Sequence, residues 1–176
     1  LINMAHPLLK QGLVILDTPG LNAIGAEPEL TVSLLPQAHA VVFILAADTG
    51  VTKSDLSIWR QHLSVLGEGN ESRLVVLNKI DTMWDALSSP EQVQLQIASQ
   101  RTDAADILGL SPRQVLAVSA QKGLLAKVNR DKKLLEASKL MELETALGVD
   151  LLGQRRQILR TAVASGIQSL RLETGR

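Results

Sequence analysis

Three short polar motifs carry the residue types of this chain that could do chemistry. They are Asp17–Gly20 (Asp-Thr-Pro-Gly), Asn78–Asp81 (Asn-Lys-Ile-Asp) and Ser119–Lys122 (Ser-Ala-Gln-Lys). Each directly follows a short apolar run, which is typical of a buried strand that ends in a loop. Because open parallel α/β sheets bind ligands outside the carboxyl ends of their strands, the three motifs together predict one ligand site.

The first motif could hold a metal ion and a phosphate. The Asp17 carboxylate could bind Mg²⁺ through water, because Mg²⁺ keeps much of its hydration shell. Gly20 would let the backbone approach a terminal phosphate, and its N–H could donate to that phosphate. Loss of the phosphate would then release the loop. Taken alone, the same four residues also suit an ordinary turn.

The second motif predicts recognition of a guanine base. The Asp81 carboxylate could accept hydrogen bonds from the N1–H and the 2-amino group of guanine, whereas adenine has no matching pair of donors. Leaving such groups unpaired is costly, so the contact would discriminate between the bases. Asn78 could brace neighbouring loops, and the aliphatic stem of Lys79 could cover the base. The alternative interpretation is a capped turn after a strand.

The third motif is the least specific of the three. Ser119 and Ala120 are small, so their backbone N–H groups could approach the guanine oxygen, but an ordinary helix cap would use the same residues. The order of the motifs and their shared position after apolar runs favour a nucleotide site over three unrelated turns.

Strands and helices alternate along most of the chain. Strand-like runs lie at residues 12–16, 40–46, 73–77 and 114–118, with one more option at 1–5. The run Val41–Leu45 is apolar without alternation, which is typical of a strand covered on both faces. Helical patterns start near Pro28, Ser54 and Ser88. This order predicts a doubly wound, mostly parallel α/β sheet, and the patterns from about Lys133 onwards predict a helical C-terminal extension.

Composition excludes several classes of function. The 176 residues include 18 basic and 18 acidic side chains, which gives no support for electrostatic capture of nucleic acid. There is no cysteine, as suits a cytoplasmic protein, and His6, His39 and His62 lack metal-ligand spacing. No apolar stretch reaches the roughly 20 residues that span a bilayer. The chain begins at Leu1 without a signal-peptide pattern, so we expect the interior of a longer protein.

With these motifs, the chain resembles the GTPase domain of the dynamin superfamily, and more specifically the bacterial dynamin-like proteins. The segments that carry the resemblance are His6–Gly12, Asp17–Asn22, Ala47–Asp55 and Asn78–Trp84. The similarity covers roughly residues 1–127. It implies a P-loop GTPase-like fold, with residues 1–130 as a partial GTPase domain and residues 131–176 as a helical segment that leads towards a bundle or stalk.

The resemblance also implies a role for each motif residue, with GTP and Mg²⁺ as cofactors. Asp17 would be linked to Mg²⁺ through water, and Gly20 would contact the γ-phosphate. The guanine-reading residues would be Asn78, Lys79 and Asp81, with Ser119 and Ala120 closing the base pocket.

One expected part is missing from the sequence. A phosphate-binding loop of the form GxxxxGK[ST] should lie well before Asp17, yet only sixteen residues precede Asp17 and none fit. Gly50–Ser54 has Lys-Ser without the preceding glycine and is expected to cap a helix. Leu21 stands where some small GTPases carry a water-orienting glutamine, so no catalytic residue is assigned. We therefore expect a GTPase domain that is incomplete at its N-terminus.

Two functions remain open at this point. The first is part of a dynamin-like GTPase that binds and hydrolyses GTP, coupled to self-assembly and membrane remodelling. Its expected partners are guanine nucleotide, further copies of itself and a membrane reached through other parts of the protein, but no nucleic acid. The second is a non-enzymatic remnant or interaction module that keeps the fold without the phosphate loop. By itself the chain is expected to be inactive.

Overall fold

The computed structural model describes residues 5–10, 12–18, 33, 35, 38, 40–64, 73–84 and 88–151. The chain divides into two compact units. One combines Leu1–Leu16 with Glu144–Arg176, and the other is Asp17–Leu143. The second unit therefore holds the Asn78–Asp81 and Ser119–Lys122 motifs.

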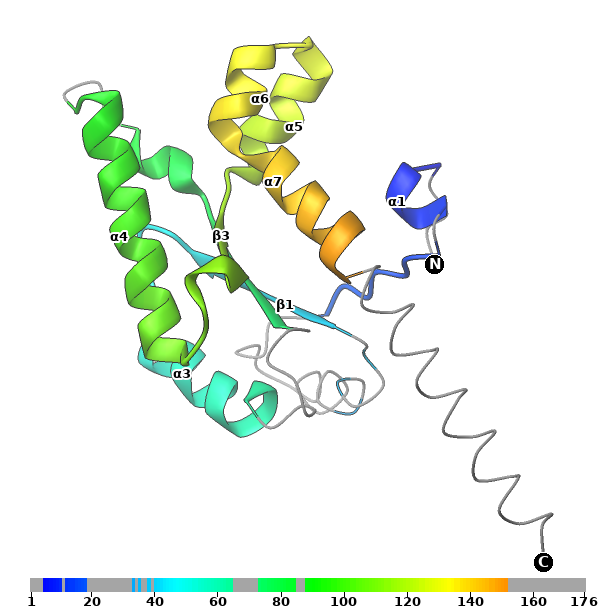
Figure 1. Ribbon diagram of the computed structural model, residues 1–176, viewed down its shortest axis with the longest axis vertical. Helices are drawn as coiled ribbons and strands as arrows, with labels where there is room; N and C mark the ends of the chain where they lie inside the picture. Colours follow the sequence, from blue (N-terminus) through cyan, green and yellow to red (C-terminus); the bar gives the residue numbers. More distant parts are fainter. Residues whose placement is uncertain are drawn as a thin grey trace, which may run out of the picture. The chain divides into compact units, whose positions relative to one another are not determined.

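A parallel sheet forms the centre of the unit Asp17–Leu143 (Figure 1). Among the described residues it has three strands in the order β1 (Val41–Ala46), β2 (Arg73–Asn78) and β3 (Val115–Ala117). β1 pairs with β2 from Val41↔Arg73 to Ala46↔Asn78, and β2 pairs with β3 from Val75↔Val115 to Leu77↔Ala117. The predicted mostly parallel α/β fold is confirmed.

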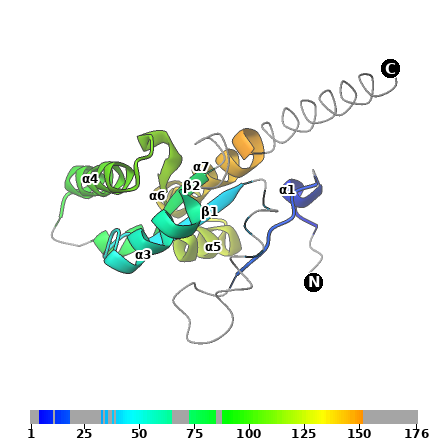
Figure 2. The same cartoon turned by 90° about the horizontal axis from the view of Figure 1, so that it is seen from below.

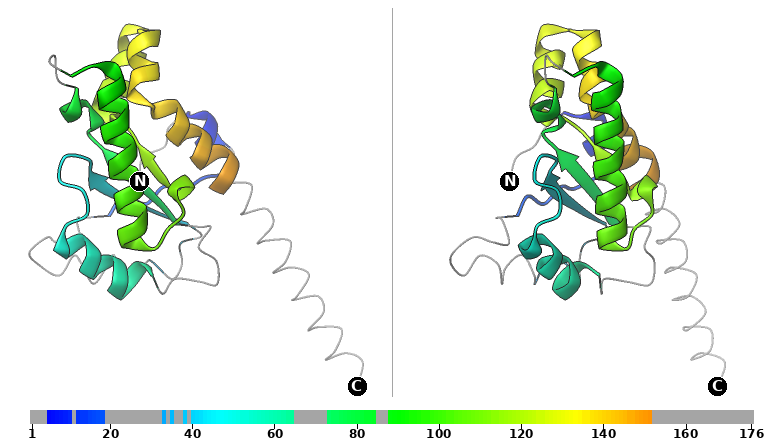
Figure 3. Two further views of the ribbon diagram at one scale, coloured as in Figure 1. Left: turned by 60° about the vertical axis from the view of Figure 1, so that its left-hand side comes forward. Right: turned by 90° about the vertical axis from the view of Figure 1, so that its left-hand side faces the viewer.

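Helices connect each strand to the next, as parallel strands require. Between β1 and β2 lie α3 (Lys53–Ile58) and the π-helix η2 (Trp59–Leu63). Between β2 and β3 lie the 3₁₀-helix η4 (Ile80–Met83), α4 (Pro90–Leu108) and the 3₁₀-helix η5 (Pro112–Gln114). Figure 3 shows α4 along one face of the sheet.

Local sequence signals set both ends of α4. The Ser89 side chain accepts a hydrogen bond from the backbone N–H of Gln92, the Gln92 side chain reaches back to Ser89, and Pro90 occupies the first turn. Gly109 ends the helix in the left-handed conformation, at φ 67°. The pKa of Glu91 is lowered, first by a hydrogen bond with the Ser89 side chain. The helix predicted to start near Ser88 is confirmed, and it ends at Leu108.

The segment Gly50–Ser54 caps a helix, as expected from its sequence. Thr52 is the N-cap of α3: its hydroxyl accepts from the Asp55 N–H at 3.2 Å, and its own N–H donates to Asp55 Oδ2 at 3.0 Å. The helix thus begins slightly earlier than the predicted Ser54–Asp55. The Lys-Ser pair of this segment lies in the first turn of α3.

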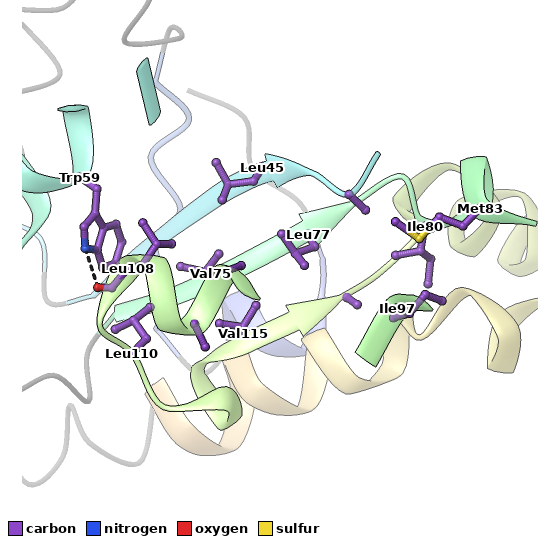
Figure 4. Packing of buried hydrophobic residues seen from close by; sticks show 14 of the residues in the cluster. Leu45, Trp59, Val75, Leu77, Ile80, Met83, Ile97, Leu108, Leu110 and Val115 are labelled. Carbon is purple, nitrogen blue, oxygen red and sulfur yellow. Dashed lines mark hydrogen bonds between the residues drawn. The ribbon is translucent and has the colours of Figure 1, made fainter. Parts of the chain in front are cut away.

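Trp59 belongs to the hydrophobic core and lies beside Leu108 at the end of α4 (Figure 4). It is 3% exposed, and its Nε1–H donates to the Leu108 carbonyl at 3.0 Å. Its ring centroid is 5.7 Å from that of Phe43, and the Arg73 guanidinium lies 6.0 Å from it. Trp59 is therefore a packing residue of the hydrophobic core.

The predicted strand at residues 12–16 is wrong. Residues 13–18 have no regular secondary structure, and Val14, Ile15 and Leu16 are 75%, 64% and 61% exposed. A strand needs a hydrogen-bonding neighbour, and no described strand pairs with this segment. The segment before it contains a short helix, α1 (Pro7–Lys10). The strand suggested at residues 1–5 and the helix near Pro28 lie almost wholly outside the described residues.

The chain after β3 is helical, and the helix predicted from about Lys133 onwards is confirmed for the described residues. It forms α5 (Ala120–Asn129), α6 (Lys132–Ser138), α7 (Leu140–Thr145) and the π-helix η6 (Ala146–Leu151). α5 and α6 pack against each other (Figure 2). Residues 152–176 lie outside the described part, so their predicted helix stays a prediction. None of the described helices has the length and apolar character needed to cross a membrane.

Candidate functional site

The second and third motifs meet at the carboxyl ends of β2 and β3. Backbone bonds join the segments that leave the two strands: the Val118 N–H donates to the Leu77 carbonyl at 2.9 Å, and the Ile80 N–H donates to the Val118 carbonyl at 3.2 Å. Parallel neighbours end at the same edge of a sheet, so both motifs are delivered to one place. The structure thus brings the Asn78–Asp81 and Ser119–Lys122 loops together.

Asn78 braces the two loops. Its Oδ1 atom accepts one hydrogen bond from the N–H of Lys79 at 2.8 Å and another from the N–H of Ala120 at 3.0 Å. One amide oxygen can accept both bonds because it has two lone pairs. The two loops are 42 residues apart in sequence and are fixed to each other by this side chain.

Lys79 turns the chain so that Asp81 enters the site. Its φ of 69° lies in the left-handed region, which is uncommon for a residue with a Cβ. Its carbonyl accepts from the Thr82 hydroxyl at 2.7 Å and from the Thr82 N–H at 3.0 Å. Buried Ile80 and Met83 anchor the short helix η4 that follows. The strained turn is therefore held from several sides.

A hydrogen bond between the loops orients the Asp81 carboxylate. The Ser119 hydroxyl donates to Asp81 Oδ1 at 2.5 Å, and the same hydroxyl oxygen accepts from the Lys122 N–H at 3.2 Å. An ionised carboxylate has about four acceptor positions, so acceptor capacity remains for a ligand with two adjacent donors. The Ser119–Asp81 contact is the feature that the sequence did not predict, because no local pattern joins residues 38 positions apart.

The backbone N–H groups of Ser119 and Ala120 have partners within the protein. The Ser119 N–H donates to the Ser138 carbonyl at 2.9 Å, and the Ala120 N–H donates to Asn78 Oδ1 at 3.0 Å. The sequence predicted that these groups would approach a base oxygen. Such a contact would have to be shared with the existing bonds, as happens in three-centre hydrogen bonds at helix termini.

The first motif is only partly described. Asp17 is exposed and has no regular secondary structure, and Gly20 lies outside the described residues. Within the part of the chain that the structure describes, no group of three or more His, Cys, Asp or Glu side chains could hold a metal ion. A lone carboxylate suits an ion that binds chiefly through water and ligand phosphates, which is the usual mode of Mg²⁺.

The bond from Asn78 to Ala120 gives a direct test of how the loops are held. We expect Asn78→Ala to lower the free energy of unfolding by about 1–3 kcal/mol, because two N–H groups lose their acceptor. Urea denaturation measures the loss, and amide exchange should accelerate at Ala120. The control is Asn129→Ala at the exposed C-terminus of α5. Equal stability of the two variants would contradict the bracing role.

Comparison with known proteins places the chain among much longer relatives. No protein-family model matches it. It is 28% identical over 172 residues to the isoniazid-induced protein IniA of Mycobacterium tuberculosis, covering 96% of this chain and 24% of IniA. It is 29% identical over 124 residues to a probable chloroplastic transmembrane GTPase, FZO-like, of Arabidopsis thaliana, covering 70% and 13%. It is 30% identical over 94 residues to a bacterial dynamin-like protein of Nostoc punctiforme, covering 53% and 13%.

A comparison with solved structures gives a weaker similarity, at 21% identity. The matched structure is the crystal structure of Era in complex with MgGDPNP and nucleotides 1506–1542 of 16S ribosomal RNA, with a TM-score of 0.47, and the match covers 74% of this chain and 37% of that chain. The expectation that this chain has no nucleic-acid partner stays a prediction.

The comparisons support a GTPase-domain fold. The chain is distantly similar to proteins named as a GTPase and as a dynamin-like protein. It spans about a quarter or less of the length of the curated relatives it matches. The parallel sheet and the two loops at its edge are in accord with that fold.

Proposed function

We propose that this chain is part of a dynamin-like GTPase whose intact form binds GTP with Mg²⁺ and hydrolyses GTP. The observation that carries the proposal is the pair of loops at the ends of β2 and β3, in which Ser119 orients the Asp81 carboxylate. Asn78 holds the same two loops at a fixed spacing. The relatives named as a GTPase and as a dynamin-like protein support the assignment.

Guanine is the base that suits this arrangement. Asp81 can accept from two adjacent donors, as the N1–H and 2-amino group of guanine provide. The stem of Lys79, exposed beside it, can cover one face of the base. Adenine would leave the carboxylate without donors, which is costly at a site built around hydrogen bonds. Asn78, Lys79, Asp81, Ser119 and Ala120 form the base-reading part of the proposed site.

The phosphates of the nucleotide would be held by groups outside the base-reading part of the proposed site. Asp17 would hold Mg²⁺ through water and Gly20 would donate to the γ-phosphate. When bound, Mg²⁺ would neutralise charge on the phosphates. The sequence has no GxxxxGK[ST] loop, whose N–H groups and lysine normally hold them. We therefore expect the chain alone to bind GTP weakly and not to hydrolyse it.

The intact protein is proposed to couple hydrolysis to self-assembly. A dynamin-like relative supports this, and a relative named as a transmembrane GTPase supports a location at a membrane surface. The helices from α6 onwards would lead towards the parts that assemble. We place the GTPase part itself in the cytoplasm.

A nucleotide titration tests the proposal. A fluorescent GTP analogue is titrated into this chain and into a longer protein that carries the sequence encoded upstream of Leu1, with and without Mg²⁺. We expect tight, Mg²⁺-dependent binding only by the longer protein, displaced by GTP and not by ATP. Failure of both proteins to bind would favour the alternative, an interaction module that keeps the fold without nucleotide binding. Tight binding by this chain alone would contradict the need for an upstream phosphate loop.

A further inference from the structure

We propose that the junction between α6 and α7, residues 138–140, is part of the base-reading site and controls its selectivity for guanine. The junction acts through Ser119, which it holds by the backbone and which in turn orients Asp81. Ser138 and Gly123 are thus positioning residues. The inference rests on the proposed recognition of guanine and adds a link from the C-terminal helices to that recognition.

Ser138 contacts the backbone of Ser119 directly. Both residues are fully buried, and the Ser119 N–H donates to the Ser138 carbonyl at 2.9 Å. The Ser138 hydroxyl donates to the Leu135 carbonyl at 2.6 Å and accepts from the Leu140 N–H at 3.3 Å. A serine rather than an alanine at position 138 therefore holds the turn between α6 and α7, and that turn supplies the acceptor for Ser119.

Gly123 allows this turn to lie against α5. A Cβ atom at position 123 would come within 2.7 Å of Leu140 Cδ2, 2.8 Å of Leu140 Cβ and 3.1 Å of Ser138 Oγ. Real Cβ atoms essentially never make contacts as short as the first two, and the contact with Leu140 Cβ cannot be relieved by rotating the end of that side chain. With any larger residue at position 123, α5 and the turn must therefore shift relative to each other. Gly123 also belongs to the same helical turn as Ser119, because its N–H donates to the Ser119 carbonyl at 2.9 Å.

The contacts form one continuous path from the helices to the ligand-facing carboxylate. Ser138 holds the backbone of Ser119, and the Ser119 hydroxyl holds Asp81 Oδ1. The Ser119 side chain also caps α5 by accepting from the Lys122 N–H, so α5, the α6–α7 junction and Asp81 are all joined through this one residue. A displacement of the α6–α7 junction therefore moves the carboxylate that would accept the 2-amino group of guanine.

The selectivity for guanosine over inosine distinguishes an effect on the position of Asp81 from a general loss of stability. Guanosine and inosine differ by the 2-amino group, so the ratio of their affinities reports how well Asp81 is placed. We expect Gly123→Ala to lower this ratio roughly threefold to tenfold, the usual worth of one hydrogen bond. Chemical-shift titration of the ¹⁵N-labelled 176-residue chain with guanosine, inosine and adenosine measures it.

Gly109→Ala is the matched control. Gly109 has φ 67°, so an alanine there strains the backbone, although its Cβ would meet nothing within 4 Å. It follows α4 and precedes β3, whereas Ser119 follows β3, so the two sites lie at opposite ends of the strand. We expect this variant to lose stability and keep the guanosine-to-inosine ratio of the parent chain.

A second variant and a ligand-free measurement keep the test decisive. Ser138→Ala removes the hydroxyl that holds the turn, and both variants should accelerate amide exchange at Ser119 relative to Gly109→Ala. Unchanged exchange at Ser119 and an unchanged guanosine-to-inosine ratio in both variants would overturn the inference. A parent chain that does not prefer guanosine to adenosine would instead refute the proposed function, while the exchange at Ser119 would still test the link to the helices.

Discussion

Asp81→Asn is expected to abolish the preference of the protein for guanine over adenine. The amide of asparagine would turn a donor towards the two donors of guanine, and the Ser119 hydroxyl would lose its charged acceptor. Sites that recognise a ligand through buried hydrogen bonds discriminate strongly, so we expect a loss of about 100-fold or more in the affinity ratio. Competition of GTP and ATP against a fluorescent GTP analogue on the longer protein measures it, and guanosine and adenosine serve for the 176-residue chain.

The control for this variant is Asp106→Asn on the exposed surface of α4. It makes the same chemical change near the C-terminal end of α4, which precedes β3, whereas the Ser119–Lys122 loop follows β3, so it should leave the base preference unchanged. A protein with Asp81→Asn that still preferred guanine would remove Asp81 from the proposed site. It would also require another group to read the base.

Trp59→Ala is expected to cause the largest loss of stability, about 3–5 kcal/mol in the free energy of unfolding. The side chain is almost fully buried and fills the space between Phe43 and α4. Its removal also leaves the Leu108 carbonyl without the indole N–H donor. Urea denaturation followed by circular dichroism measures the change.

Two further variants separate the causes of this loss. Trp59→Phe keeps most of the buried ring but removes the donor to Leu108, so we expect it to cost about 1–3 kcal/mol. Leu95→Ala changes an exposed residue of α4 and should stay within about 0.5 kcal/mol of the parent. If Trp59→Ala destabilised the chain no more than Leu95→Ala does, the described core would be wrong.

Local signals explain most of what the sequence predicted correctly. The capping box at Ser89, with Pro90 after it and Gly109 at the other end, needs no contact beyond α4 itself. The apolar runs 40–46, 73–77 and 114–118 all contain strands, and β2 is buried along almost its whole length, as its pattern predicts. The prediction that β1 is covered on both faces is wrong, because Ile44 is 64% exposed. The placement of the Asn78–Asp81 and Ser119–Lys122 loops at one edge follows from parallel pairing alone.

The prediction of a strand at residues 12–16 was wrong because a local sequence pattern does not show whether a partner strand is present. An apolar run becomes a strand only when another strand accepts its hydrogen bonds, and among the described residues β1, β2 and β3 pair with one another and not with this segment. The position of Trp59 in the π-helix η2 also depends on contacts that no local pattern contains. Its indole N–H bonds to the Leu108 carbonyl and its ring packs against Phe43 of β1, and both partners lie on other elements.

The sequence by itself determined which residue types stand at the ends of β2 and β3, and from these it predicted a guanine-reading site. Only the tertiary structure decided how those residues are held. The partners of Ser119 that are distant in sequence are Asp81, 38 positions before it, and Ser138 beyond the end of α5. Hydrogen bonds over such separations depend on how the helices pack. Gly123 allows α5 to pack against the α6–α7 turn because glycine has no Cβ atom.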